Sequence, residues 1–331
     1  MSVEALRQEV TARGCDFAWD QWTQMGVSGP SPGPREQRAA DPEALLLFTL
    51  EIGRHDPRLF DEVLDWLALN EQLVSVQRLR NLCRDEVDRA LVDAALSWVG
   101  QRRPRTRLAS RQKTVTPPRD RAPLFVGLST PETHVDSTFA RHGFLRAHAE
   151  PSGKSQPPDL SAPINFGFRL RRLLGVGARA EVTRALLTID APRVSSGALH
   201  ASAGFTRPNV RESLLALEDA GVARSSQVGG DRLYSMHHAG WAQLLGLGDG
   251  LPRHHDWIQI LGTLRVVARW LHAPDTDGLS EYMLSSDARA LITRLEPELR
   301  FAGVAVSGQA SMGETYWPEF AATVERLLES L

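Results

Sequence analysis

The sequence has few of the residues on which most disulfide and metal sites depend. Cysteine occurs twice in 331 residues, as Cys15 and Cys83. Two cysteines so far apart make no disulfide framework and no thiolate metal cluster, and their scarcity fits a reducing compartment. No apolar run is long enough to span a bilayer, and the first turns, with Glu4, Arg7 and Glu9, lack the apolar core of a signal peptide. We therefore expect a cytoplasmic protein without membrane contact.

An excess of charge of one sign is also missing. The formal net charge is −2, so overall charge predicts no polyanionic partner, and any nucleic-acid-binding surface has to be a local basic patch. Lysine occurs only as Lys113 and Lys154, and arginine supplies the remaining positive charge. Hydrophobic residues make up 42% of the chain, which is ordinary for a globular protein and sufficient for sizeable cores.

The common catalytic motifs are absent. The chain contains no P-loop, no HExxH, no GxSxG and no CxxC pattern. The Gly-Val-Gly sequence at 175–177 lacks the preceding strand and the remaining glycine of a dinucleotide-binding fingerprint, so we interpret it as a hinge. The histidine pairs at 237–238 and 254–255 have no cysteine nearby, and adjacent side chains point apart, which argues against a metal site. We expect no catalytic residue, no cofactor and no metal, and hence no enzyme.

Helical periodicity dominates both ends of the chain. Residues 1–99 are predicted to form an N-terminal helical domain, in which Asp41, Pro42 and Glu43 make a strong helix start. Three acids on the second helix of that domain, at positions 61, 62 and 65, suggest a solvated face. Residues 241–331 are predicted to form a C-terminal helical region, with runs over 257–271, from Ser280 or Ser286 to Pro297, and over 314–331. Its leucines and tryptophans make it a candidate dimerisation region.

A different composition separates these parts. Residues 100–163 are rich in proline and arginine, and we interpret them as an extended, partly disordered connector that lies across a neighbouring domain or partner. The arginines between 102 and 121 are interpreted either as a solvated linker or as an arm that contacts DNA.

The most specific pattern lies within a third region, 164–240. Apolar spacing predicts a helix over 178–188, a single strand contact at Val194, and a second helix over 196–202 that Ser195 caps. Gly204 follows at a tight turn. A left-handed backbone there favours glycine because other residues incur a steric penalty.

The same region continues with a third helix and a hairpin. Thr206 is predicted to cap this helix, whose apolar residues at 210, 214 and 217 form one stripe. Gly221 is placed to end it. Residues 222–228 then alternate weakly as a strand, a Gly-Gly-Asp turn follows, and residues 232–236 return.

The order of these elements resembles the winged helix-turn-helix of ArsR-like and MarR-like bacterial regulators. The resemblance covers about 60 residues, and its most specific part is the run GFTRPNVRESLLALEDAGVARSSQVGGDRLYSM at 204–236. It implies a mainly α fold, in which a central winged helix-turn-helix of three helices and a β-hairpin is flanked by N- and C-terminal helical domains. In that family the third helix enters the major groove and the hairpin contacts the backbone or the minor groove.

The side chains at these positions have the chemistry for that role. Hydroxyls at a helix start hold phosphate, arginine binds phosphate or guanine, asparagine pairs with adenine, and arginines beside the wing touch phosphate. The candidate DNA-binding residues are Ser195, Ser196, Thr206, Arg207, Asn209, Arg211, Arg224 and Arg232.

We therefore expect a sequence-specific regulator of transcription that binds double-stranded DNA. It is expected to act as a repressor and a homodimer, because a single winged domain makes few contacts and two copies match a two-fold site. The alternative is that the protein is a winged-helix adaptor that mediates protein interactions, or an antitoxin-like partner of a neighbouring gene product.

Overall fold

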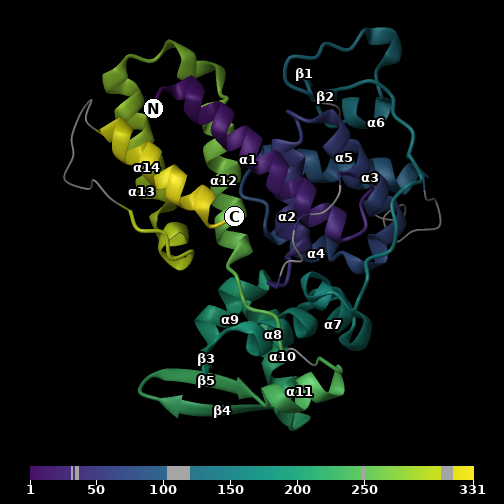
Figure 1. The fold of residues 1–331 in the computed structure, drawn as a ribbon, viewed down its shortest axis with the longest axis vertical. Helices are drawn as coiled ribbons and strands as arrows, with labels where there is room; N and C mark the ends of the chain where they lie inside the picture. The colour runs from purple at the N-terminus through teal and green to yellow at the C-terminus, as the bar shows by residue number, and fades with distance from the viewer. Residues whose placement is uncertain (31–32, 34–36, 103–119, 248–249, 307–315) are drawn as a thin grey trace.

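The computed structural model describes residues 1–30, 33, 37–102, 120–247, 250–306 and 316–331 (Figure 1). This part of the chain is mainly α, with fourteen α-helices and a small three-stranded antiparallel sheet. Four short 3₁₀ helices complete the helical elements: η1 (Glu71–Leu73), η3 (Glu132–His134), η4 (Pro163–Asn165) and η5 (Pro274–Gly278). None of the described helices is long and apolar enough to cross a membrane.

The N-terminal helices begin at polar caps, as their sequence predicts. Ser2, Asp41, Asp56 and Ser75 each accept a hydrogen bond from a backbone N–H in the first turn of the helix that follows. Every residue of α2 is buried, because this helix is apolar on most faces and lies at the centre of the helical body. We use this name for the N-terminal and C-terminal helices that share one core. The five helices are α1 (Val3–Gln24), α2 (Pro42–Ile52), α3 (Pro57–Asn70), α4 (Val76–Asn81) and α5 (Glu86–Arg102).

The C-terminal helices complete the core that the N-terminal helices begin. Trp22, Trp66, Leu264 and Phe320 belong to one continuous cluster of buried side chains. Helix α12 packs along α2, and α14 packs against α1 and α13, so the apolar stripes of the C-terminal helices are buried within the chain (Figure 1). These helices are α12 (Trp257–Leu271), α13 (Glu281–Phe301) and α14 (Tyr316–Glu329).

Two details of the helical body differ from expectation. Helix α13 continues through Pro297 to Phe301, although the proline was expected to end it. The acids of α3 are not a solvated face: Asp61 pairs with Arg146 at 2.6 Å, and the buried Asp65 accepts a hydrogen bond from Ser155 N. Their partners all come from the connector, which sequence periodicity does not reveal.

Residues 120–163 lie across α3 and α5. Arg146 holds this segment to Asp61 and lies over the rings of Phe60, Phe125 and Phe139, with the centroid of Phe139 5.1 Å from its guanidinium carbon. Its elements are β1 (Ala122–Pro123), α6 (Ser137–Ala140) and β2 (Phe144–Leu145), with the two strands paired in parallel. Residues 103–119, which include most of the candidate DNA-contacting arm, lie outside the described residues.

The third region, residues 164–240, lies below the helical body in Figure 1, and buried side chains from it form a separate apolar cluster. Strand β5 lies between β3 and β4, with Val194 opposite Tyr234 and Ser225 opposite the same tyrosine on the other side. Leu199, Phe205 and Leu214 fill the space between this sheet and the helices. The elements are α7 (Phe166–Leu174), α8 (Ala178–Thr188), β3 (Val194–Ser195), α9 (Ser196–Ala203), α10 (Arg207–Asp219), β4 (Ala223–Val228), β5 (Asp231–Met236) and α11 (His238–Leu244).

Gly204 and Gly221 in this region both have a left-handed backbone, but their surroundings differ. Gly204, with φ +66°, joins α9 to α10, and a Cβ there would meet Arg78 Nε, Leu82 and Ile258 at 3.1–3.2 Å. Gly221, with φ +69°, follows α10, and a Cβ there would meet nothing within 4 Å. The turn at Gly204 is therefore pressed against the helical body, whereas Gly221 is open.

Replacing each glycine by alanine separates backbone strain from packing. We expect G221A to lower the free energy of unfolding by roughly 1–2 kcal/mol, the usual penalty for a left-handed non-glycine residue. G204A should cost about 1–3 kcal/mol more, because its methyl group also overpacks the contact with α4 and α12. Urea unfolding followed by tryptophan fluorescence measures both. Equal losses for the two variants would show that the turn at Gly204 is not packed against the helical body.

Candidate nucleic-acid interface

The α9–turn–α10 segment is held in place by local signals in the sequence. Ser195 accepts a hydrogen bond from Ala198 N at 3.2 Å and so caps α9, and Ser196 is exposed at the first position of that helix. Gly204 ends α9 in the left-handed conformation. Phe205 is buried, and α10 begins directly after Thr206. The exposed start of α10 therefore has a fixed position relative to the start of α9.

The exposed face of α10 is a shallow groove of about 570 Å³. Arg207 and Arg211 lie along it, one helical turn apart, and neither has an ion-pair partner among the described residues. Glu212 and Asp219 line the same groove. The groove thus presents two uncompensated guanidinium groups near the helix N-terminus and carboxylates further along.

Thr206 and Asn209 contact each other. The hydroxyl of Thr206 donates to Asn209 Oδ1 at 2.6 Å and does not cap the helix by accepting from its first amides. The side-chain amide nitrogen of Asn209 is left as a donor at the edge of the groove. The two residues are therefore brought together at the tip of α10, with their hydroxyl and carbonyl groups already paired.

The two arginines of the hairpin are in different environments. Arg224, on β4, is exposed and has no ion-pair partner among the described residues. Arg232, on β5, donates to both carboxylate oxygens of Glu218 at 2.9 and 3.0 Å and to Ser225 Oγ. Arg232 therefore fastens the hairpin to α10, and its guanidinium is already paired.

The local charge around this surface is nearly balanced. Among residues 177–236, six arginines and four acids are exposed; the arginines are Arg179, Arg193, Arg207, Arg211, Arg224 and Arg232, and the acids are Asp190, Glu212, Asp219 and Asp231. Within the described part of the chain, Arg232 is the one of the six that pairs with a further acid, the half-buried Glu218. Attraction of a polyanion therefore depends on where the arginines lie and not on net charge.

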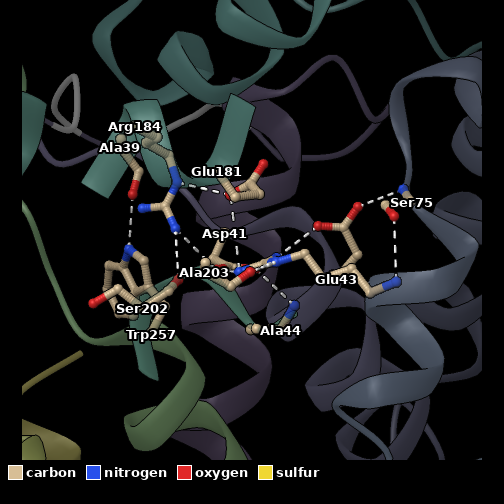
Figure 2. A network of polar contacts seen from close by, with 12 residues as sticks. Ala39, Asp41, Glu43, Ala44, Ser75, Glu181, Arg184, Ser202, Ala203 and Trp257 are labelled. Atoms are coloured by element: carbon tan, nitrogen blue, oxygen red, sulfur yellow. Dashed lines mark hydrogen bonds and ion pairs between the residues drawn. The ribbon is translucent and has the colours of Figure 1, made fainter. Parts of the chain in front are cut away.

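A buried network of charged side chains positions the turn between α9 and α10 (Figure 2). Three arginines, Arg78, Arg171 and Arg184, meet three acids, Asp41, Glu43 and Glu181, and every one of these side chains is at most 4% exposed. The six come from α4, α7 and α8 on the cationic side and from the start of α2 and α8 on the anionic side.

The geometry of the network satisfies charge and hydrogen bonding together. The carboxylate of Glu43 accepts hydrogen bonds from Arg78 Nη1 and Arg171 Nη2, each with a nitrogen–oxygen distance of 2.7 Å. Glu181 receives Arg171 at 2.7 Å and Arg184 Nε at 2.9 Å. Each carboxylate thus has two cationic partners or a cation and a backbone amide, which is the condition under which buried charges are tolerated.

The network contacts α9 at its C-terminal end. Arg78 Nε donates to the carbonyl of Ala203 at 2.7 Å, and Arg184 Nη2 donates to the carbonyl of Ser202 at 3.1 Å. These carbonyls lie in the last turn of α9, where hydrogen-bond partners within the helix run out and a positive charge is favourable. Two arginines of the network therefore cap α9 immediately before Gly204.

The pKa values of the acids follow from this arrangement. Burial alone would raise the pKa of Glu181, but attraction to Arg171, Arg78 and Arg184 lowers it well below its usual range. Burial would likewise raise the pKa of Asp41, and the attraction and hydrogen bonds of Arg78 reverse that effect. Both carboxyl groups are ionised at neutral pH, so the network stays intact there.

Sequence reasoning missed this network. Asp41 and Glu43 were recognised only as a helix start, and Arg78, Arg171, Glu181 and Arg184 drew no attention. The available signal was the placement of charged residues next to buried apolar positions on short helices. Each of Arg171, Glu181 and Arg184 lies within a run of buried positions on α7 or α8.

The described residues contain no group of three or more histidine, cysteine or carboxylate side chains that could hold a metal ion. Comparison of the chain with protein-family models, with curated proteins and with solved structures gave no match.

Removing one charge from the network should destabilise the protein. Glu181→Gln keeps the size of the side chain but leaves Arg171 and Arg184 without their shared anion, and we expect a loss of about 3–5 kcal/mol at pH 7. Glu218→Gln, which removes the exposed partner of Arg232, should cost at most about 1 kcal/mol. Urea unfolding of the three proteins at pH 7 provides the comparison.

The same variant should respond less to acid. A carboxyl group whose pKa is lowered by folding stabilises the protein above its ordinary pKa, 4.5 for Glu181, and that stability is lost as the pH falls below this value. Wild type should therefore lose stability more steeply between pH 5 and pH 3 than E181Q. Parallel curves for the two proteins would show that folding does not lower the pKa of Glu181.

Proposed function

We propose that this protein is a transcription regulator that binds double-stranded DNA through residues 177–236, which act as a winged helix-turn-helix. The observation that carries the proposal is the exposed start of α10. There, Arg207 and Arg211 lie unpaired along one groove, directly after a left-handed turn and beside a β-hairpin. A helix that is exposed in this way fits the major groove of DNA, which is wide enough to admit an α-helix.

Each predicted contact residue receives a role consistent with its environment. Ser195, Ser196 and Thr206 lie at helix starts, where backbone amides and hydroxyls bind phosphate. Arg207 and Arg211 reach phosphates or the O6 and N7 acceptors of guanine.

The remaining contacts come from Asn209 and the hairpin. Asn209 offers its amide nitrogen to a base edge, and it reads adenine with both groups once its carbonyl oxygen is released from Thr206. Arg224 is the hairpin arginine assigned to phosphate. Arg232 is assigned to fastening the hairpin to α10 through Glu218.

In this proposal the protein acts as a homodimeric repressor. A single unit makes few base contacts, and useful specificity requires two units on a two-fold site. Because the apolar stripes of α12 and α14 are buried within the chain, the dimer has to use other surfaces. The exposed side chains of Tyr282, Met283 and Phe301 on α13 offer apolar area for this purpose.

A second candidate function is a protein-binding adaptor. The groove on α10 is also lined by Pro208, Leu215 and Ala216, and Leu215 is 39% exposed. An apolar strip flanked by charges on a helix also fits a protein partner. DNA binding by the purified protein separates the two candidates.

The proposal predicts the effect of removing the two groove arginines. Duplexes selected from a random library by the full-length protein provide the ligand, and fluorescence anisotropy gives Kd as a function of salt. The variant R207A/R211A should bind about 30-fold more weakly or worse, because each lost contact to a base is worth about 1–3 kcal/mol. Its plot of log K against log salt should be shallower by about one unit for each lost phosphate contact.

Arg141→Ala is the matched control. Arg141 is an exposed arginine that follows α6 on the opposite end of the molecule from α10 (Figure 1), and its removal should leave Kd unchanged. Failure to select any duplex, or equal affinities for R207A/R211A and wild type, would refute the proposed DNA interface. In that case, loss of a captured protein partner on Leu215→Ser would favour the adaptor.

A further inference from the structure

A small cavity lies between the α4–α5 connection and α12. It has a volume of about 200 Å³, below the roughly 300–1,000 Å³ of sites for drug-sized ligands. Its polar lining comes from Asn81, Arg84, Gln259 and Arg265, and its apolar lining includes Leu82 and Ile258. No carboxylate lines it among the described residues. The cavity is therefore small, lined by two arginines and partly apolar.

Both arginines of the cavity retain unused hydrogen-bond donors. Nε of Arg265 and Nη1 of Arg84 are buried and have no hydrogen-bond partner among the described residues. The Arg265 side chain is only 3% exposed. Its Nη2 pairs with Asp88 at 2.8 Å, and Nη2 of Arg84 lies 3.6 Å from Glu298. Each guanidinium group therefore has one carboxylate neighbour outside the cavity and one buried N–H group without a hydrogen-bond partner in the described part of the chain.

Leaving such donors unpaired is costly. A buried N–H without an acceptor has lost its hydrogen bonds to water without replacement, and the penalty is larger when the group is charged. Burial also lowers the pKa of both Arg84 and Arg265, even though Asp88 and Glu298 act in the opposite direction. The carboxylates around the cavity therefore do not fully compensate for the desolvation of these two cations.

We propose that this cavity is a binding site for a small oxyanion, either a phosphate or a short carboxylate, that regulates the protein. An oxyanion supplies several acceptors at once and forms charge-assisted hydrogen bonds with guanidinium donors. Arg84 and Arg265 bind its oxygens, and the amides of Asn81 and Gln259 are the further polar groups within the cavity.

The apolar residues that line the cavity also pack against the turn between α9 and α10. Leu82 and Ile258 line the cavity, and their terminal carbons lie 3.1 and 3.2 Å from the position of a Cβ on Gly204. The same two residues line a neighbouring groove with His200 and Thr206. An occupant of the cavity therefore touches the side chains on which the turn before α10 rests.

This contact gives the site a regulatory consequence, which rests on the proposed DNA-binding function. Binding of the oxyanion fixes Leu82 and Ile258 and so changes the position or mobility of the turn. Couplings of this kind typically change the affinity of the second site about 5- to 150-fold.

Binding is tested by isothermal titration calorimetry of the full chain. Inorganic phosphate and acetate are titrated separately at constant ionic strength. We expect one saturable site for at least one of them, which also distinguishes phosphate from carboxylate chemistry. Arg84→Gln should weaken it at least tenfold. Gly262→Ala should do the same without removing a charge, because its methyl group would lie 2.9 Å from Arg84 Nη2 and displace it.

Arg80→Gln is the matched control, since Arg80 lies on α4 but pairs with Asp93 outside the cavity. It should bind the probe as wild type does, and circular dichroism confirms that each variant is folded. Absence of saturable binding by both probes would overturn the site, as would equal affinities in R84Q and R80Q. So would a site occupied only by water in crystals grown with the probe.

The coupling is tested with and without DNA. Saturating probe should change amide hydrogen exchange at residues 199–207 in wild type and R80Q but not in R84Q, and an unchanged turn would overturn the coupling. The Kd for a selected duplex should change in the same proteins. If the probe binds and alters the turn but no duplex is ever bound, the proposed function fails while the oxyanion site stands.

Discussion

The arrangement of this molecule depends on six charged side chains that have no access to water. Arg78, Arg171 and Arg184 are held against Asp41, Glu43 and Glu181 in a region where an unpaired charge would be prohibitively costly. Because the groups come from α2, α4, α7 and α8, the network fixes the third region to the helical body in one register. Apolar contacts alone would tolerate small shifts, whereas paired guanidinium and carboxylate groups accept few geometries. The precise attachment of the α9–α10 turn is a result of this selectivity.

The buried charge network also explains how the surface around α10 is held in place although the apolar core beneath it is small. Phe205, Leu199 and Leu214 belong to the minor cluster that supports α10. The turn before α10 is additionally capped by two arginines and rests on Leu82 and Ile258 of the helical body. A surface held from two sides has less conformational freedom to lose than one held by a hairpin alone, which is an advantage for the binding role proposed for α10.

The positions of the helices and strands of the third region could be predicted closely from the sequence. How this region is attached to the helical body could not. Ser195, Gly204 and Gly221 are local signals, since each acts on its own helix end, and the helices and hairpin begin and end near these residues and Thr206. The network depends on contacts more than 100 positions apart, as between Glu43 and Arg171, and such contacts leave no periodicity in the sequence. The acids of α3 were misinterpreted because their partners in the connector lie 85–90 positions away. The pairs Arg232–Glu218 and Thr206–Asn209 are local, but they depend on side-chain rotamers, which the residue pattern does not specify.

The shared core has a consequence for the synthesis of the protein. Helix α2 is apolar on nearly every face, and the helix that covers it, α12, lies more than 200 positions further along the chain. At about 5–20 residues per second, α2 leaves the ribosome on the order of tens of seconds before its cover. During this interval α2 can meet its partners in α1, α3, α4 and α5 but not α12. The central helix of the core therefore stays partly uncovered until the last quarter of the chain has been translated.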